Sequence, residues 1–261
     1  MKTFVKSFLL LTLCYLPFAE ASVCPFPIFA TARSFSTAGD GSWFVTTGDF
    51  NGDGKPDAVV ANFESSTVAV LLGNGDGTLQ APVTYAVGYE PQWITVADVN
   101  RDGKQDLIVA SIGCAPCASG QTPGGIFVLL GNGDGTFQKG ISVAQDNPSQ
   151  LAVGDFNGDG KPDIMAAFSG QEYLELLLGN GDGSFQVPEQ ILTTQETGVA
   201  AVAIGDFNGD GKLDAVSTQQ WQRRCLLHSR ERGWHFRPGD YFRQSEFERF
   251  VPVHRRGRLQ R

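Results

Sequence analysis

Short apolar runs of four to six residues, separated by turn-forming residues, extend over most of the chain. One unit contains four such runs, at residues 43–47, 58–61, 67–72 and 83–87. They are rich in valine and aromatic residues and are bounded by glycine and asparagine, which is typical of strands joined by tight turns. No helical periodicity occurs in this region. The pattern therefore predicts a four-stranded antiparallel sheet.

The unit recurs with a period of about fifty residues. An acidic segment stands between its first and second runs in four copies, at residues 49–57, 98–106, 155–163 and 206–214. A second motif, Leu-Gly-Asn-Gly-Asp-Gly, recurs in phase from Leu72, Leu130 and Leu178. Four-stranded sheets repeated around an axis make a β-propeller. We expect an all-β fold, a propeller of about four blades whose ring is incomplete.

Each acidic segment, which we call an acidic loop, places oxygen-bearing side chains at alternate positions. In the first copy these are Asp49, Asn51, Asp53 and Asp57, with the Lys55 carbonyl between the last two. Oxygen ligands of this kind suit a hard cation, so the loops predict Ca²⁺ sites. The other copies supply the same donors from Asp98, Asn100, Asp102, Lys104, Asp106, Asp155, Asn157, Asp159, Lys161, Asp163, Asp206, Asn208, Asp210, Lys212 and Asp214.

Two other calcium-binding arrangements are less consistent with the sequence. An EF-hand requires a glutamate at position 12 of its loop, and that position holds Val60, Val109, Ala166 and Ser217. The Leu-Gly-Asn-Gly-Asp-Gly motif could bind calcium through Asp76, Asp134 and Asp182, but it offers one carboxylate per copy. We interpret this motif as a glycine-rich hairpin turn.

The two motifs together resemble a known repeat family. Gly-Asp-Phe-Asn-Gly-Asp-Gly-Lys-Pro-Asp at 48–57 and Leu-Leu-Gly-Asn-Gly-Asp-Gly-Thr-Phe at 129–137 resemble FG-GAP/VCBS repeats and are similar to integrin α-chain propellers. The resemblance covers about residues 28–219 and implies about seven blades in an intact propeller, with calcium in the loop between adjacent strands of a blade. We expect an extracellular scaffold for cell adhesion or ligand binding. The second copy departs from the pattern at Arg101 and Gln105, and neither change removes a proposed ligand.

The N-terminus has the pattern of a secretory signal peptide. Lys2 and Lys6 precede a short apolar run, and Ala19-Glu-Ala21 is typical of a cleavage site, so we expect residues 1–21 to be removed and the protein to be secreted. No other segment is long enough to suggest a membrane span. In an oxidising compartment Cys114 and Cys117 predict a short local disulfide, with a redox-active pair as the alternative.

The last part of the chain differs in composition from the repeats at 22–219. Residues 1–219 contain 9 Lys and Arg against 24 Asp and Glu, whereas residues 220–261 contain 11 Arg against 4 acids. Residues 230–236 and 257–261 can each be encoded by codons that spell a repeat motif when they are read one nucleotide later. The shifted frame gives Gly-Asn-Gly-Asp-Gly-Thr-Phe for 230–236 and Gly-Asp-Tyr-Asn-Gly for 257–261, which are the motifs expected at these positions. We interpret 220–261 as a frameshifted tail outside the native fold; a basic tail that binds nucleic acid is the alternative.

The composition argues against catalysis. All three histidines lie in the tail. Residues 1–219 therefore cannot contain a Ser-His-Asp triad, a Cys-His pair or a histidine that acts as a general base. We expect no catalytic residue and no organic cofactor, and a partner that is an extracellular glycan or protein, not nucleic acid. The alternative is a propeller fragment of a larger secreted enzyme or lectin-like protein. Trp43, Tyr89 and Trp93 could form a glycan site, or could pack between blades.

Overall fold

The computed structural model describes residues 32–113, 124–145, 147–192, 199–219, 225–228 and 240–242. The chain divides into two compact units, Met1–Ser34 and Phe35–Arg261, and every described strand lies in the second. The predicted signal peptide and the predicted Cys114–Cys117 disulfide lie outside the described residues.

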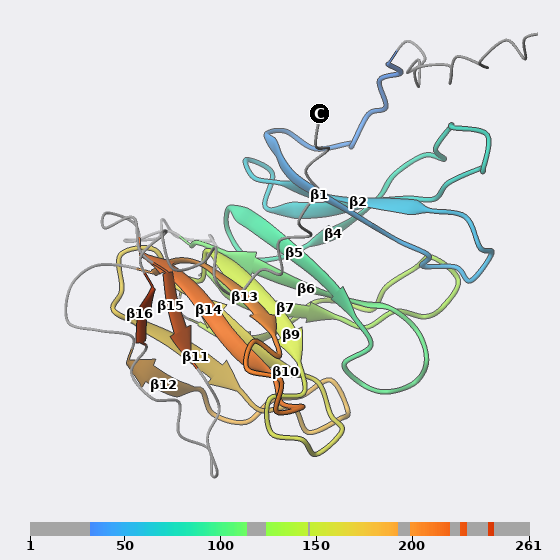
Figure 1. The fold of residues 1–261 in the computed structure, drawn as a ribbon. Coiled ribbons are helices and arrows are strands. Elements are labelled where there is room, and N and C mark those ends of the chain that lie inside the picture. The colour runs from blue at the N-terminus through green and yellow to red at the C-terminus, as the bar shows by residue number, and fades with distance from the viewer. Residues whose placement is uncertain are drawn as a thin grey trace, which may run out of the picture. The chain divides into compact units, whose positions relative to one another are not determined.

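The described residues form four antiparallel sheets of four strands each, which we call blades 1 to 4 (Figure 1). In each blade the strands follow one another in chain order, so every connection is a hairpin. No helix occurs among the described residues. The all-β fold of repeated four-stranded blades is thereby confirmed. The strands are β1 Ser42–Gly48, β2 Asp57–Asn62, β3 Thr67–Leu71, β4 Val83–Ala86, β5 Pro91–Ala97, β6 Asp106–Ser111, β7 Gly125–Leu129, β8 Ile141–Ala144, β9 Gln150–Gly154, β10 Asp163–Ala167, β11 Tyr173–Leu177, β12 Glu189–Leu192, β13 Val199–Gly205, β14 Asp214–Gln219, β15 Cys225–His228 and β16 Asp240–Phe242.

The hydrophobic core lies between successive blades. Val59 and Val70 of blade 1 pack with Leu107 of blade 2, and Met165 of blade 3 packs with Val202 of blade 4. Every residue of β6 is buried, because this strand has a neighbouring blade on each face. A strand covered on both faces can be apolar at consecutive positions, which explains the run Leu-Ile-Val-Ala in its sequence.

The two ends of each blade differ in how regular their connections are. The first and second strands are joined by eight residues in all four blades, at 49–56, 98–105, 155–162 and 206–213. At the opposite end, the connection between the second and third strands is 63–66 in blade 1 but 112–124 in blade 2. Constant length marks the end that carries the acidic loops.

Large apolar side chains remain exposed on the first and fourth blades. Trp43 and Val45 of β1 are 65% and 60% exposed. Phe207 of blade 4 is 45% exposed, whereas its counterpart Phe50 is 3% exposed and packs edge-on against Phe137 of blade 2, at 5.4 Å between ring centroids. Among the described residues no fifth blade supplies a ring for Phe207.

The structure places two short segments of the predicted tail in blade 4, where we expected none. Cys225–His228 pairs with β14, and Asp240–Phe242 pairs with Cys225–His228. Leu226 and His228 are both fully buried. An unpaired sheet edge can pair with a segment that was not selected for it, because the hydrogen bonds of the edge are made by backbone groups. This pairing is therefore compatible with a shifted reading frame. The frameshift stays a prediction, which the coding sequence across residues 215–261 checks.

His228 makes the pairing of β15 testable by pH. Its Nε2 lies 3.0 Å from Ser217 Oγ, its Nδ1 has no hydrogen-bond partner among the described residues, and burial lowers its pKa from 6.5 to about 4. The unfolded chain therefore takes up the proton first as the pH falls, and stability present above pH 6.5 is lost between pH 6.5 and 4. We expect a loss of about 3 kcal/mol. His228→Gln should abolish this part of the pH dependence in urea denaturation; an NMR titration of His228 near pH 6.5 would show that β15 does not form.

Candidate functional site

The four acidic loops join the first and second strands of their blades and share one geometry. In the first loop the two carboxylate oxygens of Asp49 accept hydrogen bonds from the backbone amides of Asp53 (3.1 Å) and Gly54 (2.9 Å). The side-chain oxygen of Asn51 also accepts from the Asp53 amide, at 3.0 Å. The equivalent bonds recur in the other three loops.

So tight a loop requires left-handed backbone at two positions. Gly52 and Gly54 have φ values of 70° and 77°. The second loop places Arg101 at the position of Gly52, and Arg101 adopts φ 62°. The departure noted in the sequence therefore leaves the loop shape unchanged, at a conformational cost of about 1–2 kcal/mol.

The last aspartate of each loop is buried, and in blades 1 to 3 it fastens the loop to the second motif. Asp57 Oδ2 accepts a hydrogen bond from the Phe50 amide (2.9 Å), and its Oδ1 accepts one from the Gly73 amide (2.7 Å). We call this arrangement the aspartate clasp. Gly73 must be glycine, since a Cβ there would lie 2.2 Å from the carbonyl oxygen of Pro56. The clasp explains why the two motifs recur in phase.

Equivalent clasps occur in the following blades. Asp106 binds the amides of Val99 and Gly131, and Asp163 binds those of Phe156 and Gly179. Burial raises the pKa of Asp106 and of Asp163, and the backbone amide donors oppose this rise. Asp214 of blade 4 accepts a hydrogen bond from the Phe207 amide at 3.1 Å.

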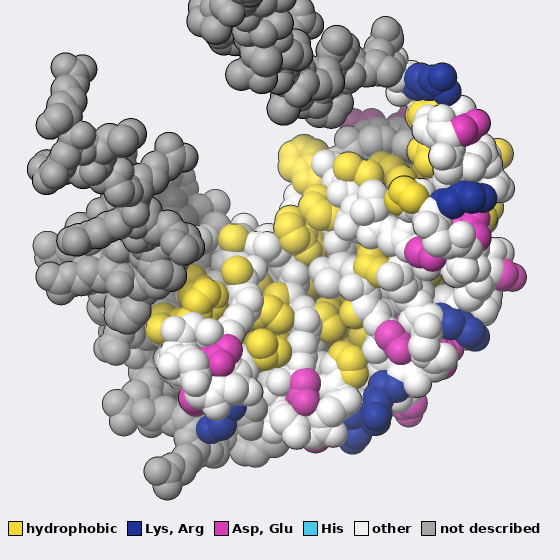
Figure 2. Space-filling view, turned by 45° about the vertical axis from the view of Figure 1, so that its right-hand side comes forward, with side chains coloured by type: hydrophobic (Ala, Val, Ile, Leu, Met, Phe, Trp, Pro, Cys, Tyr) yellow, Lys and Arg dark blue, Asp and Glu magenta, His cyan; other side chains and the backbone are white. Residues whose placement is uncertain are grey.

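Each loop also holds an ion pair between its second aspartate and its lysine. Lys55 Nζ lies 3.2 Å from Asp53 Oδ2, and the three equivalent distances are 3.4, 3.7 and 4.0 Å. The backbone amide of Lys55 donates to Asp53, and this bond together with the lysine side chain lowers the pKa of Asp53. Figure 2 shows acidic and basic side chains lying next to one another along one border of the molecular face in view.

The donor set of each loop fits calcium in its chemistry. Asp49, Asn51, Asp53 and Asp57 supply only oxygen donors, and the Asp57 carboxylate is buried with amide hydrogens as its bonding partners. The carboxylates within a loop are separately bonded to backbone amides, and over the part of the chain that the structure describes, no three His, Cys, Asp or Glu side chains form a metal-binding group. The calcium ligands stay a prediction.

The second motif forms the hairpin turn that the sequence predicts. Asn74 Nδ2 donates to Thr78 Oγ1, and Asp76 Oδ1 accepts from the backbone amide and hydroxyl of Thr78. Gly73 and Leu79 close the turn by an isolated antiparallel bridge. The same bonds recur around Asp134 and Asp182, so these aspartates stabilise turns.

The three aromatic residues considered as a glycan site, Trp43, Tyr89 and Trp93, differ in their surroundings in the structure. Trp93 lies in the core between blades, where its ring packs on Phe44 at 4.4 Å between centroids. Trp43 is exposed and packs on Phe63. Tyr89 is half-buried. Core packing is therefore the correct interpretation for Trp93.

Gln105, which departs from the repeat pattern, has a structural role that the sequence did not predict. The side-chain oxygen of Gln105, in the loop of blade 2, accepts a hydrogen bond from the Asp49 amide of blade 1 at 2.9 Å. The other copies have proline or leucine at this position, and this difference was the sequence feature that could have indicated a special role for Gln105. Gln105 thus connects two acidic loops of successive blades.

Comparison with known proteins agrees with this architecture. A solved lectin of Agrocybe aegerita, whose structure describes specific recognition of non-reducing terminal N-acetylglucosamine, is similar with a TM-score of 0.54 and 20% identity over 77% of this chain. The chain spans 52% of that lectin. The V. cholerae biofilm matrix protein Bap1 matches with a TM-score of 0.45 and 17% identity, over 70% of this chain and 26% of Bap1.

Three further observations bear on the family of this chain. No curated protein sequence matches the chain. None of the described residues belongs to a helix long and apolar enough to cross a membrane. The model of the FG-GAP-like repeat matches three times, at residues 49–109, 117–166 and 155–217, which together include all four acidic loops. The chain therefore belongs to the FG-GAP-like repeat family.

Proposed function

We propose that this protein is a secreted, non-catalytic, calcium-binding repeat protein whose blades form a scaffold for an extracellular glycan or protein. The observation that carries the proposal is the fourfold repetition of one oxygen-donor loop around a carboxylate that is buried in every copy, at Asp57, Asp106, Asp163 and Asp214. A buried carboxylate is costly unless opposite charge or hydrogen bonds compensate it. Backbone amides supply these hydrogen bonds at Asp57, and the other two aspartates and the asparagine of the loop add further oxygen donors around it, so the loops are suited to a hard cation.

When bound, calcium supplies positive charge that joins the two strands flanking each loop. In the first loop Asp49, Asn51, Asp53, Asp57 and the Lys55 carbonyl would hold it. The backbone amides of Asp53 and Gly54 orient the Asp49 carboxylate, and the ammonium group of Lys55 pairs with the Asp53 carboxylate and orients it. The protein's part is thus to pre-arrange the donors on a rigid blade.

Binding of an extracellular ligand is supported by the fold and by the predicted signal peptide. The Agrocybe aegerita lectin, which shares the fold, recognises a terminal sugar. A second candidate, a fragment of a longer propeller protein, is favoured by the exposed Phe207 ring and by the partial coverage of that lectin. Both candidates leave the calcium loops with the same role.

Calcium stoichiometry tests the proposal. Isothermal titration of the full chain should count four ions, and Asp53→Ala should reduce the count to three because it removes a charged ligand from one loop. Asp76→Ala is the matched control, since Asp76 lies in a hairpin turn and its loss should leave four ions bound. A chain that binds no calcium, or an Asp53→Ala variant that still binds four ions, contradicts the proposal.

A further inference from the structure

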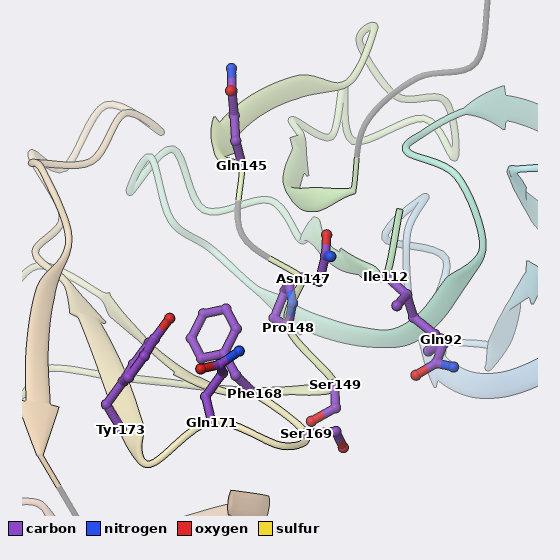
Figure 3. A pocket seen from close by; sticks show the side chains of 10 residues that line it. All are labelled: Gln92, Ile112, Gln145, Asn147, Pro148, Ser149, Phe168, Ser169, Gln171 and Tyr173. Carbon is purple, nitrogen blue, oxygen red and sulfur yellow. The ribbon is translucent and has the colours of Figure 1, made fainter. Parts of the chain in front are cut away.

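A small pocket lies at the boundary between blades 2 and 3. Its volume is about 300 Å³, near the lower limit for small-molecule pockets. We call it the interblade pocket; its walls come from the start of β5, the segment between β8 and β9 and the hairpin between β10 and β11 (Figure 3). The residues that matter most are Gln92, Gln145, Asn147, Phe168, Gln171 and Tyr173.

The described residues that line the interblade pocket are mostly polar. None of the described residues that line it carries a formal charge. Four primary amides, those of Gln92, Gln145, Asn147 and Gln171, make no hydrogen bond to another described residue. Each amide offers donors and an acceptor side by side. Figure 3 shows Asn147 and Gln171 near the rings of Phe168 and Tyr173, whereas the Gln145 side chain points away from them. A primary amide can bind a hydroxyl group, which also donates and accepts.

One side of the interblade pocket is aromatic. The rings of Phe168 and Tyr173 lie 5.5 Å apart between centroids with 45° between their planes. Figure 3 shows these rings on one side, Gln92 and Ile112 on the other, and Asn147 and Pro148 between them. Phe168 is buried and Tyr173 is half-buried. Aromatic rings offer a flat apolar surface against which the C–H face of a sugar can pack, and the tyrosine hydroxyl adds a polar edge.

The aromatic wall is a property of this boundary and not of the repeat. In blade 2 the positions of Phe168 and Tyr173 hold Ser111 and Gly125, which pair with each other across β6 and β7. In blade 1 they hold Asn62 and Thr67, whose side chains are hydrogen-bonded to each other at 3.3 Å. Blade packing therefore does not require the two rings.

We propose that the interblade pocket binds a neutral carbohydrate of one or two sugar units, which names the ligand class of the proposed binding scaffold and rests on that function. Amides would bind the hydroxyl groups, and Tyr173 would pack against the ring of the sugar. An acidic sugar is disfavoured, because the described lining residues include no cation to pair with its carboxylate.

The test is binding of methyl glycosides to the full chain in calcium. Saturation-transfer NMR and isothermal titration would use glucose, galactose, mannose, fucose and the N-acetylhexosamines as neutral probes, with glucuronic acid and sialic acid as charged probes. We expect at least one neutral glycoside to bind and the charged ones to bind at least tenfold more weakly. Tyr173→Ala should weaken binding at least tenfold, and Gln171→Ala by about threefold to tenfold.

Gln138→Ala is the matched control, because Gln138 is an exposed glutamine outside the pocket. Its sugar affinity should equal that of the wild-type chain. Gln171 is exposed, so its variant keeps the test valid if Tyr173→Ala fails to fold. The pocket proposal is overturned if no neutral glycoside binds, or if binding survives both pocket variants. The number of calcium ions bound should be measured in the same samples. If four ions bind but no sugar does, the pocket proposal is wrong and the proposed calcium-binding function still stands.

Discussion

Asp57→Ala should lower the free energy of unfolding by about 2–5 kcal/mol, even in the presence of a calcium chelator. The change removes the acceptor for the amides of Phe50 and Gly73, and the Asp57 carboxylate that they bind is 1% exposed. Each buried donor left without a partner costs about 1–3 kcal/mol. Urea denaturation of wild-type and variant chains in chelator measures the difference.

Asp53→Ala is the control for that experiment. Asp53 is exposed and its partners lie at the surface, so its loss in chelator should cost much less stability than the loss of Asp57. The two variants should therefore differ clearly without calcium, although both remove a predicted ligand of the same loop. Equal losses of stability would show that the aspartate clasp has no structural role of its own.

Calcium should raise the free energy of unfolding of the repeats by roughly 2–6 kcal/mol at millimolar concentration. Sites with dissociation constants of about 10⁻⁴–10⁻³ M each contribute about 0.4–1.4 kcal/mol by mass action, and the chain has four loops. This corresponds to a rise in melting temperature of about 5–20 °C for a domain of this size. Differential scanning calorimetry in calcium and in chelator measures the shift.

Magnesium at the same ionic strength is the control for this second prediction. It requires near-octahedral geometry and keeps several of its waters, so it should stabilise the chain less than calcium. Identical melting curves in calcium, magnesium and chelator would contradict specific calcium binding. A shift that is equal in calcium and magnesium would indicate general screening of the acidic loops.

The blades could be predicted because their signals are local in the chain. The runs at 43–47, 58–61 and 83–87 correspond to β1, β2 and β4 within one residue at either end. Short apolar runs set the strands, and glycine with positive φ sets the turns between them. Each of these signals is contained within about ten residues, so no knowledge of packing was needed.

The contacts that organise the site could not be predicted in the same way. The Asp57 oxygens bind amides 7 and 16 residues away, and Gln105 binds an amide 56 residues away in another blade. The constant spacing of the two motifs indicated a link between them, but not its atoms. Spacing alone also does not reveal that Asp57 is buried while Asp53 is exposed.

The interblade pocket is assembled from segments that are far apart in the sequence. Gln92 and Tyr173, on opposite sides of it, are separated in the sequence by most of blade 2 and the first two strands of blade 3. A comparison of the repeats does contain a signal, because Phe168 and Tyr173 replace small or polar residues of the other copies. That signal becomes meaningful only once the register places both rings on one wall.

The aspartate clasp divides each blade into an end that must stay constant and an end that is free to change. At the clasped end an added residue would separate Asp57 from Gly73, or bring a side chain against the Pro56 carbonyl. At the other end the described residues form no equivalent clasp, and the hairpin lengths already differ between blades 1 and 2. The interblade pocket lies at this second end. New ligand specificities can therefore arise by changing hairpins there, while the stability supplied by the acidic loops is retained.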